Sequence, residues 1–189
     1  NTSYLNRTAN VTYYSGSSGT TTTTVSTSTI GIKDSTKNMI SESMWYLRGY
    51  NRSSVYSDQI YEYERTKGSV YNSTRPTSWP GKIALAYPSD YGYAVDFGKC
   101  QKQLSGYNDS TCTSNNWMKT IIAPNYGWLL TPASGYSNLA WDVRSAGIVN
   151  YGNSTYNAYG VVPVLYLGSE LEIKAGGDGS SSGPYQLSA

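Results

Sequence analysis

The chain contains no histidine, and charged residues make up only 14% of its 189 residues. Without histidine, the commonest general base and the commonest metal ligand are both missing. Charged residues average about 25% of globular domains, so Ser, Thr, Asn, Gly and tyrosine hydroxyls must supply most of the surface polarity here. This composition is more typical of extracellular β-rich proteins than of cytosolic enzymes.

Strong charge and long apolar segments are missing as well. The net charge is only +2, without a cluster of Lys or Arg, so we expect neither a nucleic-acid partner nor an anionic membrane surface. No stretch approaches the roughly 20 apolar residues of a membrane span, so we expect no direct membrane insertion of this fragment. The sequence opens at Asn1 without a signal peptide, so we expect the export signal or anchor to have lain upstream.

Cysteine is scarce, with only Cys100 and Cys112, which lie in a segment rich in small polar residues. Two cysteines cannot complete a tetrahedral zinc site without other ligands. We predict a disulfide, worth roughly 2–3 kcal/mol through loop closure, with a pair of free thiols as the alternative. A disulfide would imply an oxidising compartment.

Tyrosine, in contrast, is abundant, with 20 Tyr against 1 Phe. Because a buried tyrosine needs a partner for its hydroxyl, we predict that many of these hydroxyls face water or a ligand. Tyr, Asn, Ser and Gly fill the sequence between two hydrophobic segments, residues 128–131 and 161–167. Such a mixture is typical of recognition surfaces, where Tyr supplies rigid contact area and the small polar residues supply hydrogen bonds.

The length suits one domain, or one domain with a small appendage. We expect a β-hairpin or stalk over residues 1–32, a folded domain over 33–175, and a turn and tail over 176–189. Helical spacing of apolar residues predicts a helix at about 36–48, and residues 50–80 are expected to form a tyrosine-rich loop or irregular strand. Further along, we predict a strand at 82–87, a helix starting at Pro88, a short helical stretch at 116–122, and strands and turns from Trp128 onward.

Candidate catalytic groups are few. Glu62 and Glu64 would share one face of a strand and could serve as the paired carboxylates of a glycosidase. We favour the alternative that they are a solvated pair neutralised by Arg65 and Lys67. A nucleophilic serine would lack a base, since no Ser-x-x-Lys occurs. Asp90, Asp96 and Asp109 do not have the spacing of an EF-hand calcium loop, so we predict no metal site. We also predict no catalytic residue and no cofactor.

Several blocks of sequence resemble a known group of proteins. They include Ile30-Gly-Ile-Lys-Asp-Ser-Thr-Lys37, Tyr61-Glu-Tyr-Glu-Arg65, Lys82-Ile-Ala-Leu-Ala-Tyr-Pro-Ser-Asp-Tyr-Gly-Tyr-Ala94, Leu130-Thr-Pro132, Ala140-Trp-Asp-Val143 and Gly160-Val-Val-Pro-Val-Leu-Tyr-Leu167. From about Ile30 to the C-terminus, the chain resembles the ectodomains of type IV pilin-like surface proteins of gut Firmicutes. These carry a C-type-lectin-like module of the formylglycine-generating-enzyme type and resemble the variable proteins of diversity-generating retroelements. The resemblance implies an α+β fold, mostly antiparallel β with two short helices and long loops, over residues 33–175.

The sequence also departs from this group. It has Gly160-Val-Val-Pro163 where the group usually has Gly-Val-Arg-Pro, which would remove a buried ion pair. The catalytic cysteines of formylglycine-generating enzymes have no counterpart, and the usual signatures of calcium-dependent sugar binding are missing. We therefore expect no enzymatic activity of that kind.

In such variable proteins, substitutions are concentrated at Asn-type codons near the C-terminal end of the lectin-like fold. The resemblance implies that the matching positions here bind the ligand and vary between genomes; they are Tyr136, Asn138, Trp141, Asp142, Arg144, Asn150, Tyr151, Asn153, Tyr156, Asn157 and Tyr159. The leading hypothesis is an extracellular, cell-surface recognition domain for adhesion. Its partner would be a protein or glycan on another cell, a phage or a host surface. The alternatives are a structural subunit of a pilus-like filament, which would contact other pilin subunits, and a hydrolase using Glu62 or Glu64.

Overall fold

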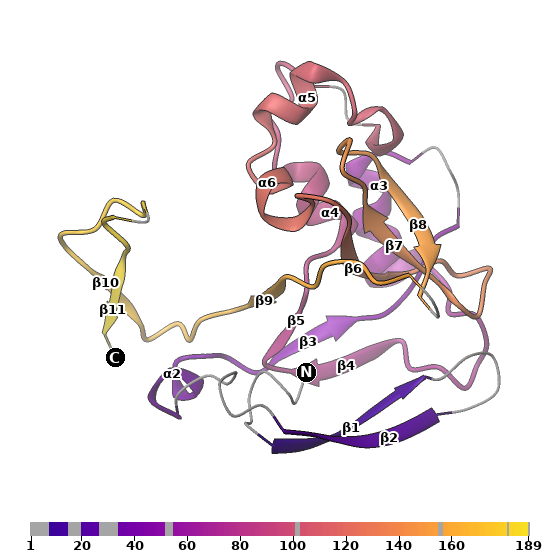
Figure 1. Ribbon diagram of the computed structural model, residues 1–189, viewed down its shortest axis with the longest axis horizontal. Coiled ribbons are helices and arrows are strands. Elements are labelled where there is room, and N and C mark those ends of the chain that lie inside the picture. The colour runs from indigo at the N-terminus through magenta and orange to yellow at the C-terminus, as the bar shows by residue number, and fades with distance from the viewer. Residues whose placement is uncertain are drawn as a thin grey trace.

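The computed structural model describes residues 8–14, 20–26, 34–51, 55–100, 103–154, 157–180 and 182–188, which form a mixed α+β structure (Figure 1). Every strand pair in these ranges is antiparallel, and most of the sheets have only two strands. The exception is the sheet of β6 (Gly127–Pro132), β7 (Leu139–Val143) and β8 (Val149–Asn153). The predicted α+β class with mostly antiparallel strands is confirmed.

The N-terminal segment forms the predicted hairpin. β1 (Thr8–Tyr14) pairs with β2 (Thr20–Ser26) in a continuous antiparallel register. Both strands are rich in Thr and Val, whose branched side chains favour extended backbone. The predicted turn at residues 15–19 lies outside the described residues, and the domain boundary at residue 32 stays a prediction.

The predicted helix at 36–48 is wrong for most of its length. Helix α2 covers only Asp34–Asn38, and strand β3 (Ser43–Tyr46) follows it. Within β3, Trp45 is buried while Met44 and Tyr46 are exposed, which is the two-residue period of a strand. β3 pairs with β4 (Ser78–Gly81), and the indole Nε1 of Trp45 donates to the Gly81 carbonyl at 2.8 Å. Burial of this one large ring therefore outweighed the helical spacing of its smaller apolar neighbours.

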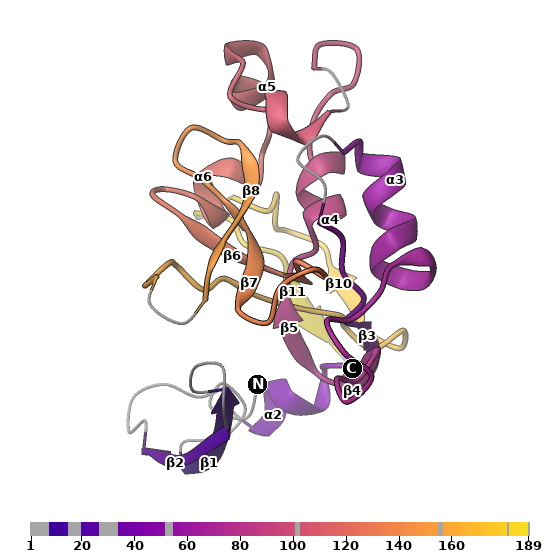
Figure 2. The ribbon, with the colours of Figure 1, turned by 90° about the vertical axis from the view of Figure 1, so that its right-hand side faces the viewer.

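The expectation of a loop or irregular strand over 50–80 is wrong for residues 57–67. Helix α3 (Ser57–Glu62) continues into the π-helical turn η1 (Tyr63–Lys67). Buried Ser57, Ile60 and Glu64 recur at helical spacing, a signal that the alternating tyrosines concealed. This face packs against α4 (Pro88–Tyr93), which lies beside α3 in Figure 2.

The central strand and helix after residue 80 agree with expectation. β5 (Ile83–Leu85) pairs with β9 (Pro163–Leu165), so Pro163 lies in a two-stranded sheet where it interrupts no central ladder. Helix α4 begins at Pro88, and the Asp90 carboxylate accepts a hydrogen bond from the Tyr87 backbone N–H at 2.9 Å.

Nine tyrosines of the described residues are exposed, as expected if many hydroxyls face water, but several others belong to the core. The Tyr91 hydroxyl donates to the Gly147 carbonyl at 3.1 Å, and the Tyr107 hydroxyl donates to the Gly92 carbonyl at 2.7 Å. Tyr50 and Tyr87 are buried as well. Backbone carbonyls thus supply the partners that a buried phenol requires.

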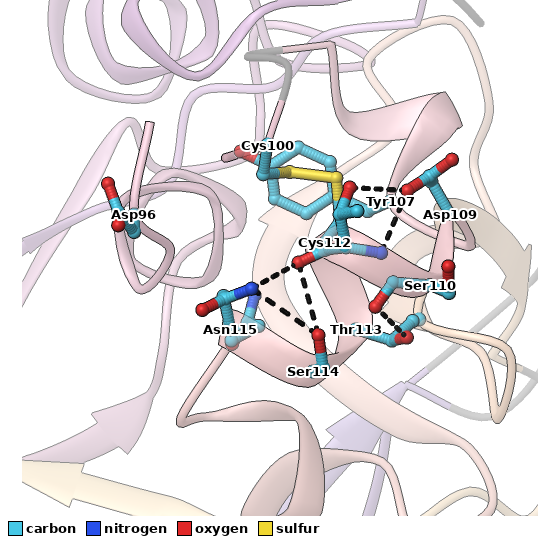
Figure 3. Close-up of a disulfide and its surroundings, with 12 residues drawn as sticks. Asp96, Cys100, Tyr107, Asp109, Ser110, Cys112, Thr113, Ser114 and Asn115 are labelled. Atoms are coloured by element: carbon cyan, nitrogen blue, oxygen red, sulfur yellow. Dashed lines mark hydrogen bonds between the residues drawn. A yellow bond between two sulfur atoms is a disulfide. The ribbon is translucent and has the colours of Figure 1, made fainter. Parts of the chain in front are cut away.

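The predicted disulfide between Cys100 and Cys112 is present (Figure 3). Cys112 lies in helix α5 (Ser110–Asn115), which the sequence analysis missed, and the Asp109 side chain caps this helix by accepting from the Thr111 N–H at 2.8 Å. The 3₁₀ turn η2 (Leu104–Gly106) precedes α5, and α6 (Lys119–Ile122) falls in the predicted helical stretch. Since the described residues contain five α-helices, the expected number of two is wrong.

The C-terminal hairpin stands apart from the body at the left of Figure 1. It consists of β10 (Glu172–Lys174) and β11 (Gln186–Ser188), which follow a long extended segment after β9. Ile173 and Tyr185 are 64% and 55% exposed on it. Across the described ranges, no helix is both long and apolar enough to cross a membrane.

Candidate functional site

Most of the ligand-binding residues expected from the resemblance lie on β7 and β8 and in the segments beside them. A tight turn joins these strands, in which the Arg144 N–H donates to the Ile148 carbonyl at 2.9 Å. Gly147 adopts φ +93° in this turn, a conformation that favours glycine. Residues 145–147 therefore form one of the turns expected after Trp128, and this turn fixes the register of the two strands.

Trp141 does not lie on an accessible surface. It is 1% exposed, and its indole Nε1 donates to the Tyr50 carbonyl at 3.0 Å. Its side chain leaves β7 on the side of Val143 and joins the main core. The prediction that Trp141 offers contact area to a ligand is contradicted by this burial.

Two tyrosines extend that core toward the surface. The Tyr151 ring meets Trp141 edge to face at 5.4 Å between centroids, and the Tyr136 ring stacks on Tyr151 at 6.0 Å. Tyr136 is 45% exposed, whereas Tyr151 is half-buried. Among the described residues predicted as aromatic contacts on this side, Tyr136 is therefore the most exposed, and its ring packs against Tyr151.

Asp142 is buried on the opposite side of β7. Its side chain has no exposed area, and neither carboxylate oxygen has a hydrogen-bond partner. The nearest cationic group is the Nε of Arg144, at 3.6 Å from Oδ1, which is too long for a hydrogen bond. Burial raises the pKa of Asp142 to about 6, against the opposing effect of the Arg144 charge. The expected direct contact of Asp142 with a ligand is thus blocked in this conformation.

An aromatic cluster lies next to Asp142. Trp128 is paired with Asp142 across β6 and β7, and the Tyr159 ring lies 4.6 Å from the Trp128 ring and 4.8 Å from the Tyr126 ring. The Trp128 N–H donates to the Gly160 carbonyl at 2.9 Å, and the Gly160 N–H donates to the Tyr126 carbonyl at 2.8 Å. These bonds hold the chain around Tyr159 against the start of β6.

The predicted asparagines make local backbone contacts and remain half-buried. Asn150 Oδ1 accepts from the Tyr151 N–H at 2.8 Å, and the Asn138 carbonyl accepts from the Ser154 N–H at 2.9 Å. The Asn157 N–H donates to the Asn153 carbonyl at 3.1 Å. Tyr156 lies outside the described residues.

A groove of about 450 Å³ opens at the end of the sheet near Asn138. We call it the Arg75 groove, and it is lined by Leu47, Val70, Tyr71, Thr74, Arg75, Pro76, Leu130, Pro132, Ser137, Asn138 and Ser154. Its lining is mainly apolar, with hydroxyl and amide groups on one side. Arg75 is the one charged residue among the described residues of the lining, and its Nη2 donates to the Ser137 carbonyl at 2.6 Å.

The residues predicted from the sequence to bind a ligand lie on only one side of this groove. Asn138 was predicted, but Tyr71 and Arg75 come from a segment 60 to 80 residues earlier that was expected to be a loop or irregular strand. The Arg75 guanidinium lies 5.6 Å from the Tyr71 ring centroid, a cation–π arrangement that holds both side chains at the rim. Only an unusual density of tyrosines marked this region, and no spacing linked it to β7 and β8.

Glu62 and Glu64 do not form a pair. Because they lie at the junction of a helix and a π-helical turn, their side chains diverge: Glu62 is exposed and pairs with Lys67, while Glu64 has no exposed area. Glu64 accepts from the Ser89 hydroxyl at 2.5 Å and from Arg65 Nη1 at 2.8 Å. Burial raises its pKa to about 7, although Ser89 and Arg65 oppose the shift. The predicted charge partners are correct, but the expected solvation of Glu64 is wrong.

The aspartates considered for calcium lie in unrelated places. Asp90 is at the start of α4, Asp96 forms an ion pair with Lys99 at 3.5 Å, and Asp109 caps α5. Within the described part of the chain, no three His, Cys, Asp or Glu side chains come together as a metal site would require.

Comparison with known proteins adds no relative from which a function could be transferred. No family model matches the chain, and no similar protein was found among curated proteins or among solved structures.

Proposed function

We propose that this chain is an extracellular recognition domain on a C-type-lectin-like scaffold, displayed at a cell surface for adhesion. Its ligand is a protein or glycan on another cell, a phage or a host surface. The sequence blocks described above support the scaffold assignment. The disulfide between Cys100 and Cys112 supports an oxidising, extracellular location.

The Arg75 groove is the observation that carries the proposal. Its volume falls in the range of ligand sites, and it combines an apolar floor with a few polar groups, as such sites do. Leu130 and Pro132 form part of the floor, while Asn138 and Ser154 supply hydrogen-bonding groups at the end of β7 and β8. The groove therefore adds a concave surface next to the tyrosine-rich face. A ligand bound in the groove would lose most of its contact with water.

Binding of the purified chain to printed oligosaccharides and to intact epithelial and bacterial cells tests this function. Tyr71→Ala removes a 47% exposed ring from the groove, and Ser154→Trp fills the groove from its rim. Each change should weaken binding at least tenfold, because loss of a central aromatic contact typically costs about 2 kcal/mol or more, and an indole placed at position 154 would block the groove. Tyr185→Ala, at an equally exposed ring on the C-terminal hairpin, is the matched control and should bind normally. Equal binding by all three variants would contradict the assignment.

The exposed C-terminal hairpin favours a second candidate, a subunit of a surface filament. An isolated two-stranded hairpin is only marginally stable in water, and this one leaves Ile173 and Tyr185 uncovered. A neighbouring subunit could cover both side chains. Light scattering should then detect concentration-dependent association that Ile173→Asp abolishes, and a chain that stays monomeric at every concentration would refute this candidate.

A further inference from the structure

The Asp142 carboxylate and the Arg144 Nε are buried polar groups without hydrogen-bond partners. Buried polar atoms in folded proteins are nearly always satisfied, so an exception of this kind calls for an explanation. The two groups lie 3.6 Å apart, and the Arg144 side chain is 40% exposed. They form an ion pair with each other, but the two carboxylate oxygens and the Nε donor make no hydrogen bond.

Gly152 allows other side chains to close over the carboxylate. A Cβ atom at Gly152 would lie 2.9 Å from Asp142 Oδ2, 3.1 Å from Tyr159 Cε2 and 3.3 Å from Asn157 Nδ2. These three side chains thus converge on one point above β8. The Tyr159 ring and the Asn157 amide are both half-buried, so they form a thin cover between Asp142 and solvent.

Tyr159 also lines a second groove, of about 370 Å³, which we call the Tyr126 groove. Its lining is Ile121, Ile122, Pro124, Asn125, Tyr126, Ala158, Tyr159, Gly160, Val161 and Val162. The described residues of this lining carry no charge. Tyr159 belongs to this lining and also lies beside Asp142, so a rotation of its side chain would connect the groove to the carboxylate.

The charges of the two groups select the ligand. Arg144 repels a metal ion or an ammonium group from Asp142, and Asp142 likewise repels a phosphate or carboxylate from Arg144. A neutral ligand that both donates and accepts hydrogen bonds satisfies the two groups together. Adjacent hydroxyls of a sugar ring have this property, because each hydroxyl is a donor and an acceptor. Tyr126, which is 38% exposed, supplies an apolar surface for the C–H face of such a ring, and the Trp128 ring, which Tyr159 covers at 4.6 Å between centroids, becomes available once Tyr159 rotates.

We propose that Asp142 and Arg144, with the rings of Tyr126 and Trp128 as an aromatic platform and Tyr159 as the side chain that rotates aside, form a subsite for a neutral sugar residue. Asp142 accepts from two adjacent hydroxyls, and Arg144 donates to one of them. No metal ion is needed. The proposal rests on the recognition function above and names its ligand class.

Methyl glycosides of glucose, galactose and mannose, titrated in the presence of EDTA, test the subsite on the intact chain. The ¹⁵N–¹H signal of the Trp128 indole should shift on titration, and Trp128→Phe identifies that signal among those of the five tryptophans. The methyl glycoside of glucuronic acid and glucosamine should each bind at least tenfold more weakly than the best neutral sugar. An unmoved Trp128 signal, or tighter binding of a charged sugar, would overturn the proposal.

Two variants probe the carboxylate itself. Asp142→Asn keeps the shape but replaces one acceptor with a donor, and Gly152→Ala places a methyl group against Oδ2. Each should weaken sugar binding at least tenfold, while Asp96→Asn, at an exposed aspartate elsewhere, should not. The indole titration of the unmodified chain decides the matter should either variant fail to fold. If the unmodified chain binds cells but responds to none of the sugars, only the subsite is overturned. If it binds neither cells nor sugars, the recognition function is overturned as well.

Discussion

Glu64 should make the stability of this protein depend on pH. Its side chain has no exposed area, and burial raises its pKa from 4.5 to about 7. Below pH 4.5 the carboxyl is protonated in both the folded and the unfolded chain. As the pH rises from 4.5 to 7, the unfolded chain releases this proton while the folded chain retains it. The folded state therefore loses stability over this window, and the contribution of the protonated carboxyl is gone above about pH 7.

The size of the effect follows from the shift. A difference of about 2.5 pH units at about 1.36 kcal/mol per unit amounts to about 3 kcal/mol in the free energy of unfolding. That is a large fraction of the typical stability of a single domain. Above pH 7 the ionised Glu64 keeps its hydrogen bonds with Ser89 and Arg65, so the domain remains folded but is less stable.

Glu64→Gln isolates this contribution, because the amide has a similar shape but does not titrate. Urea unfolding of both proteins from pH 4.5 to 8 gives the difference between their free energies of unfolding at each pH. This difference should decrease by about 3 kcal/mol across the range, and other titrating groups, such as Asp142, cancel from it. Glu62→Gln, at an exposed carboxylate two residues away, should show no such trend. Parallel curves for the unmodified protein and Glu64→Gln would refute the buried, protonated state of Glu64.

Three further substitutions test the packing of the fold. Replacing Cys100 and Cys112 with serine should lower the free energy of unfolding by about 3 kcal/mol through the lost loop constraint, as measured by urea unfolding. Trp141→Phe should cost roughly 2–4 kcal/mol in the same assay, because it leaves a cavity and removes the indole donor to the Tyr50 carbonyl, whereas Trp117→Phe at a 66% exposed ring should cost almost nothing. Gly147→Ala should cost roughly 1–3 kcal/mol and lower the melting temperature, since its φ is +93° and the new Cβ would lie 2.8 Å from a backbone oxygen.

Local signals with a single physical cause predicted their elements correctly. Pro88 starts a helix because its φ suits the first turn, and the Ser-Ala-Gly sequence before Ile148 makes a turn because Gly147 accepts positive φ. The two cysteines form the predicted disulfide for a similar reason, since the chain offers each thiol no other cysteine as a partner. In all three cases, distant residues had little influence on the outcome.

Errors arose where two periodicities competed over the same residues. Residues 36–48 show a helical spacing of small apolar side chains, but the burial of Trp45 against β4 imposed an extended strand. Near Tyr61 the opposite happened, since alternating tyrosines favoured a strand while Ile60 and Glu64 required a helix against α4. In both places, the backbone conformation is the one that buries a particular side chain in the core. Only the tertiary structure shows which side chain that is.

The same limit applies to the proposed recognition face. The composition of residues 136–159 predicts such a face, but strand alternation sends Trp141 into the core and Asp142 to the other side of the sheet, where Tyr159 covers it. Polarity alone could not distinguish a side chain that contacts a ligand from one that is buried beneath such a side chain. An exposed polar residue is hydrated at no cost, so its presence says little about binding. A carboxylate held under an aromatic ring without a hydrogen bond is costly to retain, and that cost makes Asp142 more informative about the ligand than the exposed residues around it.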